Sequence, residues 1–123
     1  MPNYTLNHVH HETDDVPGAI EFYKRVFNAT ASEPEDRKGV LWAFVKIGDI
    51  QITLTNREST PVQDTRNKAF DHIALTTDDF AGSLAHVQQV GAHIWAGPLV
   101  MDGRQIIFVS GPDNIRIELI EQI

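Results

Sequence analysis

Two histidines occupy matching positions in a sequence that repeats itself. Residues 7–18 align without gaps with residues 71–82, so that His72 falls on His8 at an offset of 64 positions (72 minus 8). A His, a Thr, two Asp and a Gly are identical in the two copies. A lone strand histidine is usually structural, but recurrence at the same place in a repeat favours a shared role, and imidazole is a common metal ligand.

The last apolar stretch of the chain supplies a carboxylate. Glu118 interrupts the mainly apolar residues 115–120, where a charge is costly unless it is paired or bound to a metal. Two histidines and a carboxylate without thiolates suit Fe(II), Mn(II), Zn(II), Co(II) or Ni(II) and leave coordination positions open for substrate. The competing interpretation is that Arg116 or Arg104 neutralises Glu118. Arg104 is also the basic residue that we single out as a possible contact for an anion.

A fourth ligand is expected from the first-copy strand that corresponds to the strand of Glu118. Aligning residues 50–54 with residues 115–119 puts Thr53, a poor ligand, at the glutamate position. Gln51 lies two residues earlier, and side chains two apart on a strand share a face. The amide oxygen of Gln51 is therefore our candidate for the fourth ligand.

The same alternation places His10 on the face of His8 and turns His11 to the other face. We interpret His10 as a candidate acid/base or as a polar neighbour of the site, and we expect His11 to be structural.

The elements that must position these residues repeat as well. Each copy predicts a β-α-β-β-β order, in which an Asp pair caps the helix and Pro17 suits the first turn of the first one. The predicted strands are residues 4–13, 29–33, 40–47 and 50–55 in the first copy, and 70–77, 93–96, 105–110 and 115–120 in the second. We expect one domain over residues 1–123, made of repeats at about 1–56 and 70–123 joined by a linker at 57–69.

Composition excludes several classes of function. At 123 residues the chain suits a single compact core, and its formal net charge of −7 disfavours nucleic acid and anionic membranes as partners. The sequence has no cysteine, so any metal must be held by nitrogen and oxygen ligands. It shows neither a secretion signal nor an apolar run approaching about 18 residues, and we therefore expect a cytoplasmic protein.

These segments resemble the vicinal oxygen chelate superfamily, which includes glyoxalase I, methylmalonyl-CoA epimerase, fosfomycin-resistance enzymes, bleomycin-binding proteins and extradiol dioxygenases. The matching pieces are residues 6–9 leading to Asp15, then 22–24, 70–75 and 111–119, which together span nearly the whole chain.

The resemblance implies an α+β fold in which two βαβββ modules form a curved mixed sheet around a divalent metal. It implies that His8, His72 and Glu118 are ligands and that Gln51 is similar to the Gln or Glu of the glyoxalase and epimerase branches. Thr53 departs from the pattern, and His10 stands where a small or apolar residue is common. A small-molecule substrate and a homodimer are also implied.

Three functions follow from the resemblance. The first is a lyase or isomerase that works through a metal-stabilised enediolate, with Glu118 or His10 moving the proton. The second is an Fe(II) extradiol-type dioxygenase with His8, His72 and Glu118 as its ligands. The third is a metal-free drug-binding protein of the bleomycin-resistance type, with Trp42, Trp95 and Phe108 lining an aromatic cleft; the three retained ligand candidates argue against it.

Overall fold

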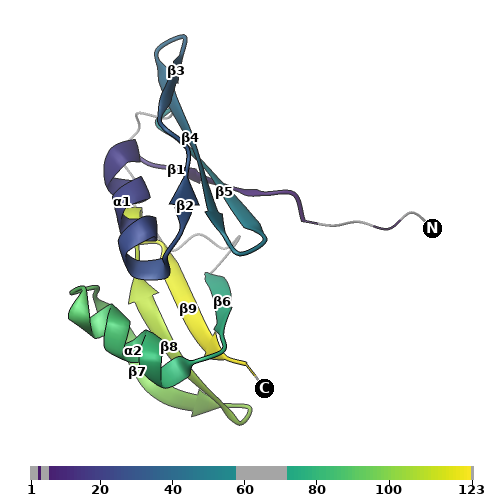
Figure 1. Ribbon diagram of the computed structural model, residues 1–123, viewed down its shortest axis with the longest axis vertical. Helices are drawn as coiled ribbons and strands as arrows, with labels where there is room; N and C mark the ends of the chain where they lie inside the picture. Colours follow the sequence, from purple (N-terminus) through teal and green to yellow (C-terminus); the bar gives the residue numbers. More distant parts are fainter. Residues whose placement is uncertain (1–2, 4–5, 58–71, 123) are drawn as a thin grey trace. The chain divides into compact units, whose positions relative to one another are not determined.

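A computed structural model describes residues 3, 6–57 and 72–122, and the chain divides into two compact units, Met1–Pro61 and Val62–Ile123. Each unit combines one long helix with its own sheet, so the predicted α+β class is confirmed (Figure 1). Neither of these helices is long and apolar enough to cross a membrane. Of the predicted linker at 57–69, only Arg57 belongs to the described residues.

The first unit has a five-stranded sheet covered by one helix. Its elements are β1 (Val9–Glu12), α1 (Val16–Phe27), β2 (Thr30–Ala31), β3 (Glu35–Arg37), β4 (Val40–Ile47) and β5 (Ile50–Thr55). The strand order is β1-β5-β4-β2, with β3 paired to β4. Strands β1 and β5 are parallel, and the other pairs are antiparallel.

The second unit repeats this plan with four strands. Its elements are β6 (Ile73–Thr77), α2 (Phe80–Gln89), β7 (Ile94–Met101), β8 (Arg104–Ser110), the short turn η1 (Pro112–Asn114) and β9 (Arg116–Glu121). The order is β6-β9-β8-β7, and β6 runs parallel to β9 as β1 runs parallel to β5.

The strand register confirms the alignment of the two copies. Val9 pairs with Ile52 in the first unit, and Ile73 pairs with Ile117 in the second. Counting from these pairs, Thr53 stands at the position of Glu118, and Gln51 stands at the position of Arg116. The asymmetry between the copies is therefore a property of the fold as well as of the sequence.

Both helices begin with the same cap, which explains two identities in the repeat. Asp15 and Asp79 each accept a hydrogen bond from a backbone N–H three residues later, that of Gly18 or Gly82, at 3.0 Å. A Cβ on either glycine would lie 2.1 or 2.2 Å from a carboxylate oxygen of that aspartate. The capping carboxylate thus occupies the space of a side chain, and a Cβ at either glycine would displace it.

The helix α1 covers one face of the sheet in the first unit. It packs on β4 and β5 and buries alternate residues of β4 together with its own apolar stripe, whereas β5 is buried on both faces over residues 52–55. His11 lies on this face, and its Nδ1 is 3.1 Å from the hydroxyl of Tyr23, so its predicted structural role is confirmed. The opposite face of β1 and β5 carries His10, because strand residues alternate in direction.

Several predicted boundaries were wrong. Strand β1 starts at Val9, so the predicted strand is too long at residues 6–8, and β6 begins at Ile73; residues 4–5 and 70–71 lie outside the described part. Strand β3 was not predicted, because its three charged residues show no apolar alternation; a two-residue turn with positive φ at Lys38 and Gly39 forms its hairpin.

Strand β7 also differs from the prediction, since it continues five residues past the predicted end at residue 96. It tolerates Pro98 because it lies at the edge of its sheet, and the register shifts between Ile94 and Leu99 absorb the irregularity.

Candidate metal centre

In the second unit the structure brings together two of the predicted ligands. His72 lies directly before β6 and Glu118 lies in β9, and the parallel pairing of these strands places both side chains on one face. Nε2 of His72 is 3.4 Å from Oε1 of Glu118, and the side chains are 30% and 13% exposed. A nitrogen and an oxygen that bind one ion at about 2.1 Å each lie about 3.0 to 3.4 Å apart. The spacing thus fits two ligands of a single ion.

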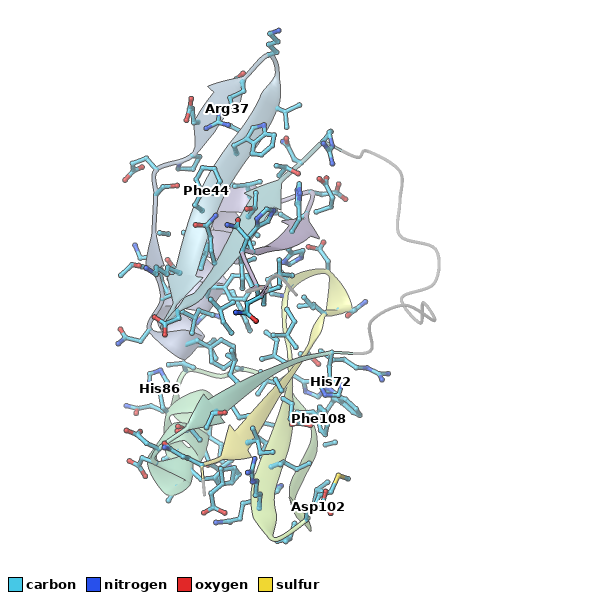
Figure 2. The ribbon with its side chains drawn as sticks, turned by 90° about the vertical axis from the view of Figure 1, so that its right-hand side faces the viewer. Arg37, Phe44, His72, His86, Asp102 and Phe108 are labelled. Atoms are coloured by element: carbon cyan, nitrogen blue, oxygen red, sulfur yellow. The ribbon has the colours of Figure 1, made fainter. Side chains whose placement is uncertain are left out.

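Aromatic rings continue from this pair along the same face. The ring of Phe108 meets His72 edge to face with centroids 5.3 Å apart, and Trp95 lies 4.9 Å from Phe108. Phe108 stands directly opposite Glu118 in the β8–β9 ladder, which is why it reaches the histidine. Figure 2 labels His72 and Phe108 side by side in this unit. The rings give the pair an apolar border.

In the first unit His8 is oriented by its neighbour. Nδ1 of His8 is 2.7 Å from Oδ1 of Asn7, and that amide oxygen can only accept, so Nδ1 carries the proton. The lone pair is then on Nε2, which is the arrangement of a metal-binding histidine whose other nitrogen donates to a polar partner. His8 lies directly before β1, and Gln51 lies in β5, one residue before the partner of Val9.

His10 is held by two residues that the sequence did not single out. Its Nε2 is 2.7 Å from Oγ1 of Thr55 and 3.1 Å from Oε1 of Glu12, and the Thr55 hydroxyl in turn donates to Glu12. Arg57 lies 3.8 Å from the same Glu12 oxygen. Because strand neighbours two apart share a face, Glu12 could have been found at His10 plus two. Thr55 could be identified only from the pairing of β1 with β5.

Thr53 stands opposite His10 in the first unit and is buried. Its hydroxyl is a weaker ligand than the carboxylate at the equivalent position in the second unit. Among the residues that the structure describes, no group of three His, Asp or Glu gathers around one point. One set of the predicted ligands belongs to each unit.

Comparison with known proteins gives these sets a context. The family model for the glyoxalase/bleomycin resistance protein/dioxygenase superfamily matches residues 5–119. The lactoylglutathione lyase of Salmonella typhimurium is 32% identical over 126 residues, covering 94% of this chain and 91% of that protein. The chain belongs to the glyoxalase/bleomycin resistance protein/dioxygenase superfamily.

Solved structures of this superfamily share the fold. A glyoxylase/bleomycin resistance protein/dioxygenase domain from Frankia sp. has a TM-score of 0.81 at 16% identity and covers 99% of this chain and 100% of that one. FosX from Listeria monocytogenes, solved with Mn(II) and sulfate, has a TM-score of 0.75 at 17% identity, covering 99% and 95%. The family membership inferred from the sequence motifs is confirmed.

Proposed function

We propose that this protein is a divalent-metal-dependent lyase or isomerase that moves a proton next to a carbonyl group of a small substrate. The contact of His72 with Glu118 carries the proposal, because it places a nitrogen and a carboxylate oxygen at the separation of two ligands of one ion. The similarity to a lactoylglutathione lyase along nearly the whole chain supports the lyase class.

The donors that we propose are those predicted from the sequence. His72 and Glu118 are the donors of the second unit, and His8 and Gln51 are those of the first. All four are nitrogen or oxygen donors, and the set carries one negative charge, which suits Zn(II), Ni(II), Co(II), Mn(II) or Fe(II). When bound, such an ion would polarise a substrate carbonyl and make the adjacent C–H more acidic.

The contacts of His10 suit it to carry the proton that moves in the proposed reaction. The Thr55 hydroxyl donates its hydrogen to Glu12. Both oxygens beside Nε2 of His10 are therefore acceptors, and Nε2 carries the proton. In the neutral ring Nδ1 then holds the lone pair that would accept a proton from substrate carbon and return it to the neighbouring atom. Glu118 is the second candidate for this role, and its contact with His72 favours ligation.

A second candidate function is an Fe(II) dioxygenase of the extradiol type, and Thr53 favours it. With threonine at the position equivalent to Glu118, the strong ligands are two histidines and one carboxylate, which is the set of non-haem Fe(II) oxygenases. The two functions differ in what they require: the dioxygenase needs Fe(II), dioxygen and a catechol, whereas the lyase or isomerase needs no dioxygen.

Metal content tests the proposal independently of activity. Protein purified without chelator, and protein reloaded with Zn(II), Ni(II), Mn(II) or Fe(II), is analysed by mass spectrometry of its metals next to His72→Ala and His86→Ala. His86 is an exposed histidine on α2 and serves as the matched control. We expect about one ion per chain in the wild type and in His86→Ala, and affinity lowered about a hundredfold in His72→Ala.

Equal and negligible metal in all three proteins would refute the proposal and favour a binding protein. Activity then separates the two enzymatic functions. Turnover of the hemithioacetal of methylglyoxal and glutathione without dioxygen supports the lyase. Cleavage of catechol only with Fe(II) and dioxygen supports the dioxygenase.

A further inference from the structure

Arg116 occupies a distinctive place on the face that carries Glu118. The two residues are two apart on β9, so their side chains leave the sheet on the same side, about 7 Å apart along the strand. The guanidinium carbon of Arg116 lies over the ring of Trp95, 4.5 Å from its centroid. Arg116 is half-buried, although it is charged. The face that carries the proposed ligand Glu118 thus also carries a guanidinium.

The ring of Trp95 contacts the guanidinium of Arg116. A guanidinium that stacks on an aromatic ring uses its flat face and carries its N–H donors along its edge. This edge has the fork geometry that matches the two oxygens of a carboxylate. Trp95 in turn contacts Phe108, which contacts His72, so one continuous row of side chains joins the guanidinium to the proposed metal ligands.

The repeat allows Arg116 to be compared with the residue at the equivalent position of the first unit. By register, Arg116 stands where the first unit has Gln51, a proposed ligand. A permanently charged guanidinium cannot coordinate a cation, so this position has a different task in the second unit. A cation kept near the proposed metal ligands, with apolar rings beside it, suits a substrate that carries a negative charge of its own.

We propose that Arg116, oriented by Trp95, binds a carboxylate of the substrate while neighbouring oxygens of the same molecule reach the metal. This inference rests on the proposed metal centre and names the substrate class: a small acid whose carboxylate stands several bonds from a pair of chelating oxygens. The intervening part of the molecule packs against Phe108 and Trp95. Arg104, the possible anion contact predicted from the sequence, lies four residues from Phe108 along β8, about 13 Å away.

A matched pair of probes isolates the carboxylate. 3,4-Dihydroxybenzoate and 4-methylcatechol offer the same two chelating oxygens, and only the first carries a carboxylate, too far away to reach the same ion. Binding of each to Zn(II)-loaded protein is measured by titration calorimetry, after the metal content has been verified. We expect the wild type to bind the acid at least about tenfold more tightly than the methyl compound.

The variants assign this preference to Arg116. Arg116→Met should remove the tenfold advantage and leave the affinity for 4-methylcatechol within about twofold, whereas Arg116→Lys should retain part of it, because an ammonium lacks the fork. Trp95→Leu should reduce the advantage and Trp95→Phe should preserve most of it. Arg104→Met, which removes a charge from the same sheet farther along, should behave as the wild type.

The outcomes distinguish this inference from the proposed function. Zn(II)-loaded protein that binds both probes equally, or in which Arg116→Met weakens both equally, overturns the role of Arg116 and leaves the metal centre standing. Loaded protein that binds neither probe also overturns it. A chain that takes up no metal overturns the proposed function, and this inference falls with it.

Discussion

The helix cap of the second unit offers a quantitative test of how the repeat is built. The carboxylate of Asp79 accepts from the N–H of Gly82, and both residues are exposed, so substitutions there leave the core intact. Removing an N-cap aspartate costs about 1 kcal/mol of stability. Gly82→Ala by itself would gain about 0.5 to 1 kcal/mol from helix propensity. Its Cβ would however lie 2.2 Å from Oδ2 of Asp79 and would expel the carboxylate.

These opposing contributions predict that the effect of Gly82→Ala on stability depends on whether Asp79 is present. In the wild type, Gly82→Ala should be neutral or destabilising by up to about 0.5 kcal/mol, because the lost cap offsets the gain in propensity. In an Asp79→Ala background the obstacle is gone, and the same substitution should stabilise by about 0.5 to 1 kcal/mol. The coupling between the two sites should thus be about 1 kcal/mol.

Urea denaturation followed by circular dichroism measures all four members of this cycle. Asp78→Ala is the matched control, since Asp78 is the adjacent exposed aspartate and Asp79 makes the cap bond; its effect should stay within about 0.5 kcal/mol. If Gly82→Ala stabilises the wild type as much as it stabilises the Asp79→Ala protein, the carboxylate does not occupy the space above Gly82, and the explanation of the repeated glycine is wrong.

Three further predictions follow. Gly97→Ala should destabilise the protein by about 2 kcal/mol in urea denaturation, because φ is +95° and its Cβ would meet the backbone oxygen of Ile106 at 2.8 Å; Gly103→Ala, also at positive φ but with open space, should cost less. Glu12→Gln should lower kcat on the hemithioacetal about tenfold with unchanged metal content, since it weakens the acceptor that orients His10; unchanged kcat would exclude His10 as the proton carrier in this orientation. Light scattering should give twice the monomer mass, because edge strand β7 exposes Val100 and Met101 at 70% and 56%, and Val100→Lys should shift the mass toward the monomer.

Local patterns in the sequence predicted most of the elements. Both long helices were predicted because an Asp cap and an apolar stripe are encoded within about a dozen residues. The short strand β3 and the far end of β7 were missed, because neither shows the alternation that marks a half-buried strand. Glu35–Arg37 is stabilised by a turn and by its neighbour β4, and β7 continues across Gly97 and Pro98 because β8 pairs with it.

The sequence by itself determined the duplication, the equivalence of His8 with His72 and the isolation of Glu118 in an apolar strand. These features depend on residue identity and spacing, and a repeated sequence shows the same identities and spacings twice. The tertiary structure decided which side chains meet: His72 with Glu118 and His10 with Thr55. These contacts join segments about 45 positions apart in the chain, and they depend on the pairing of parallel strands that no tight turn connects.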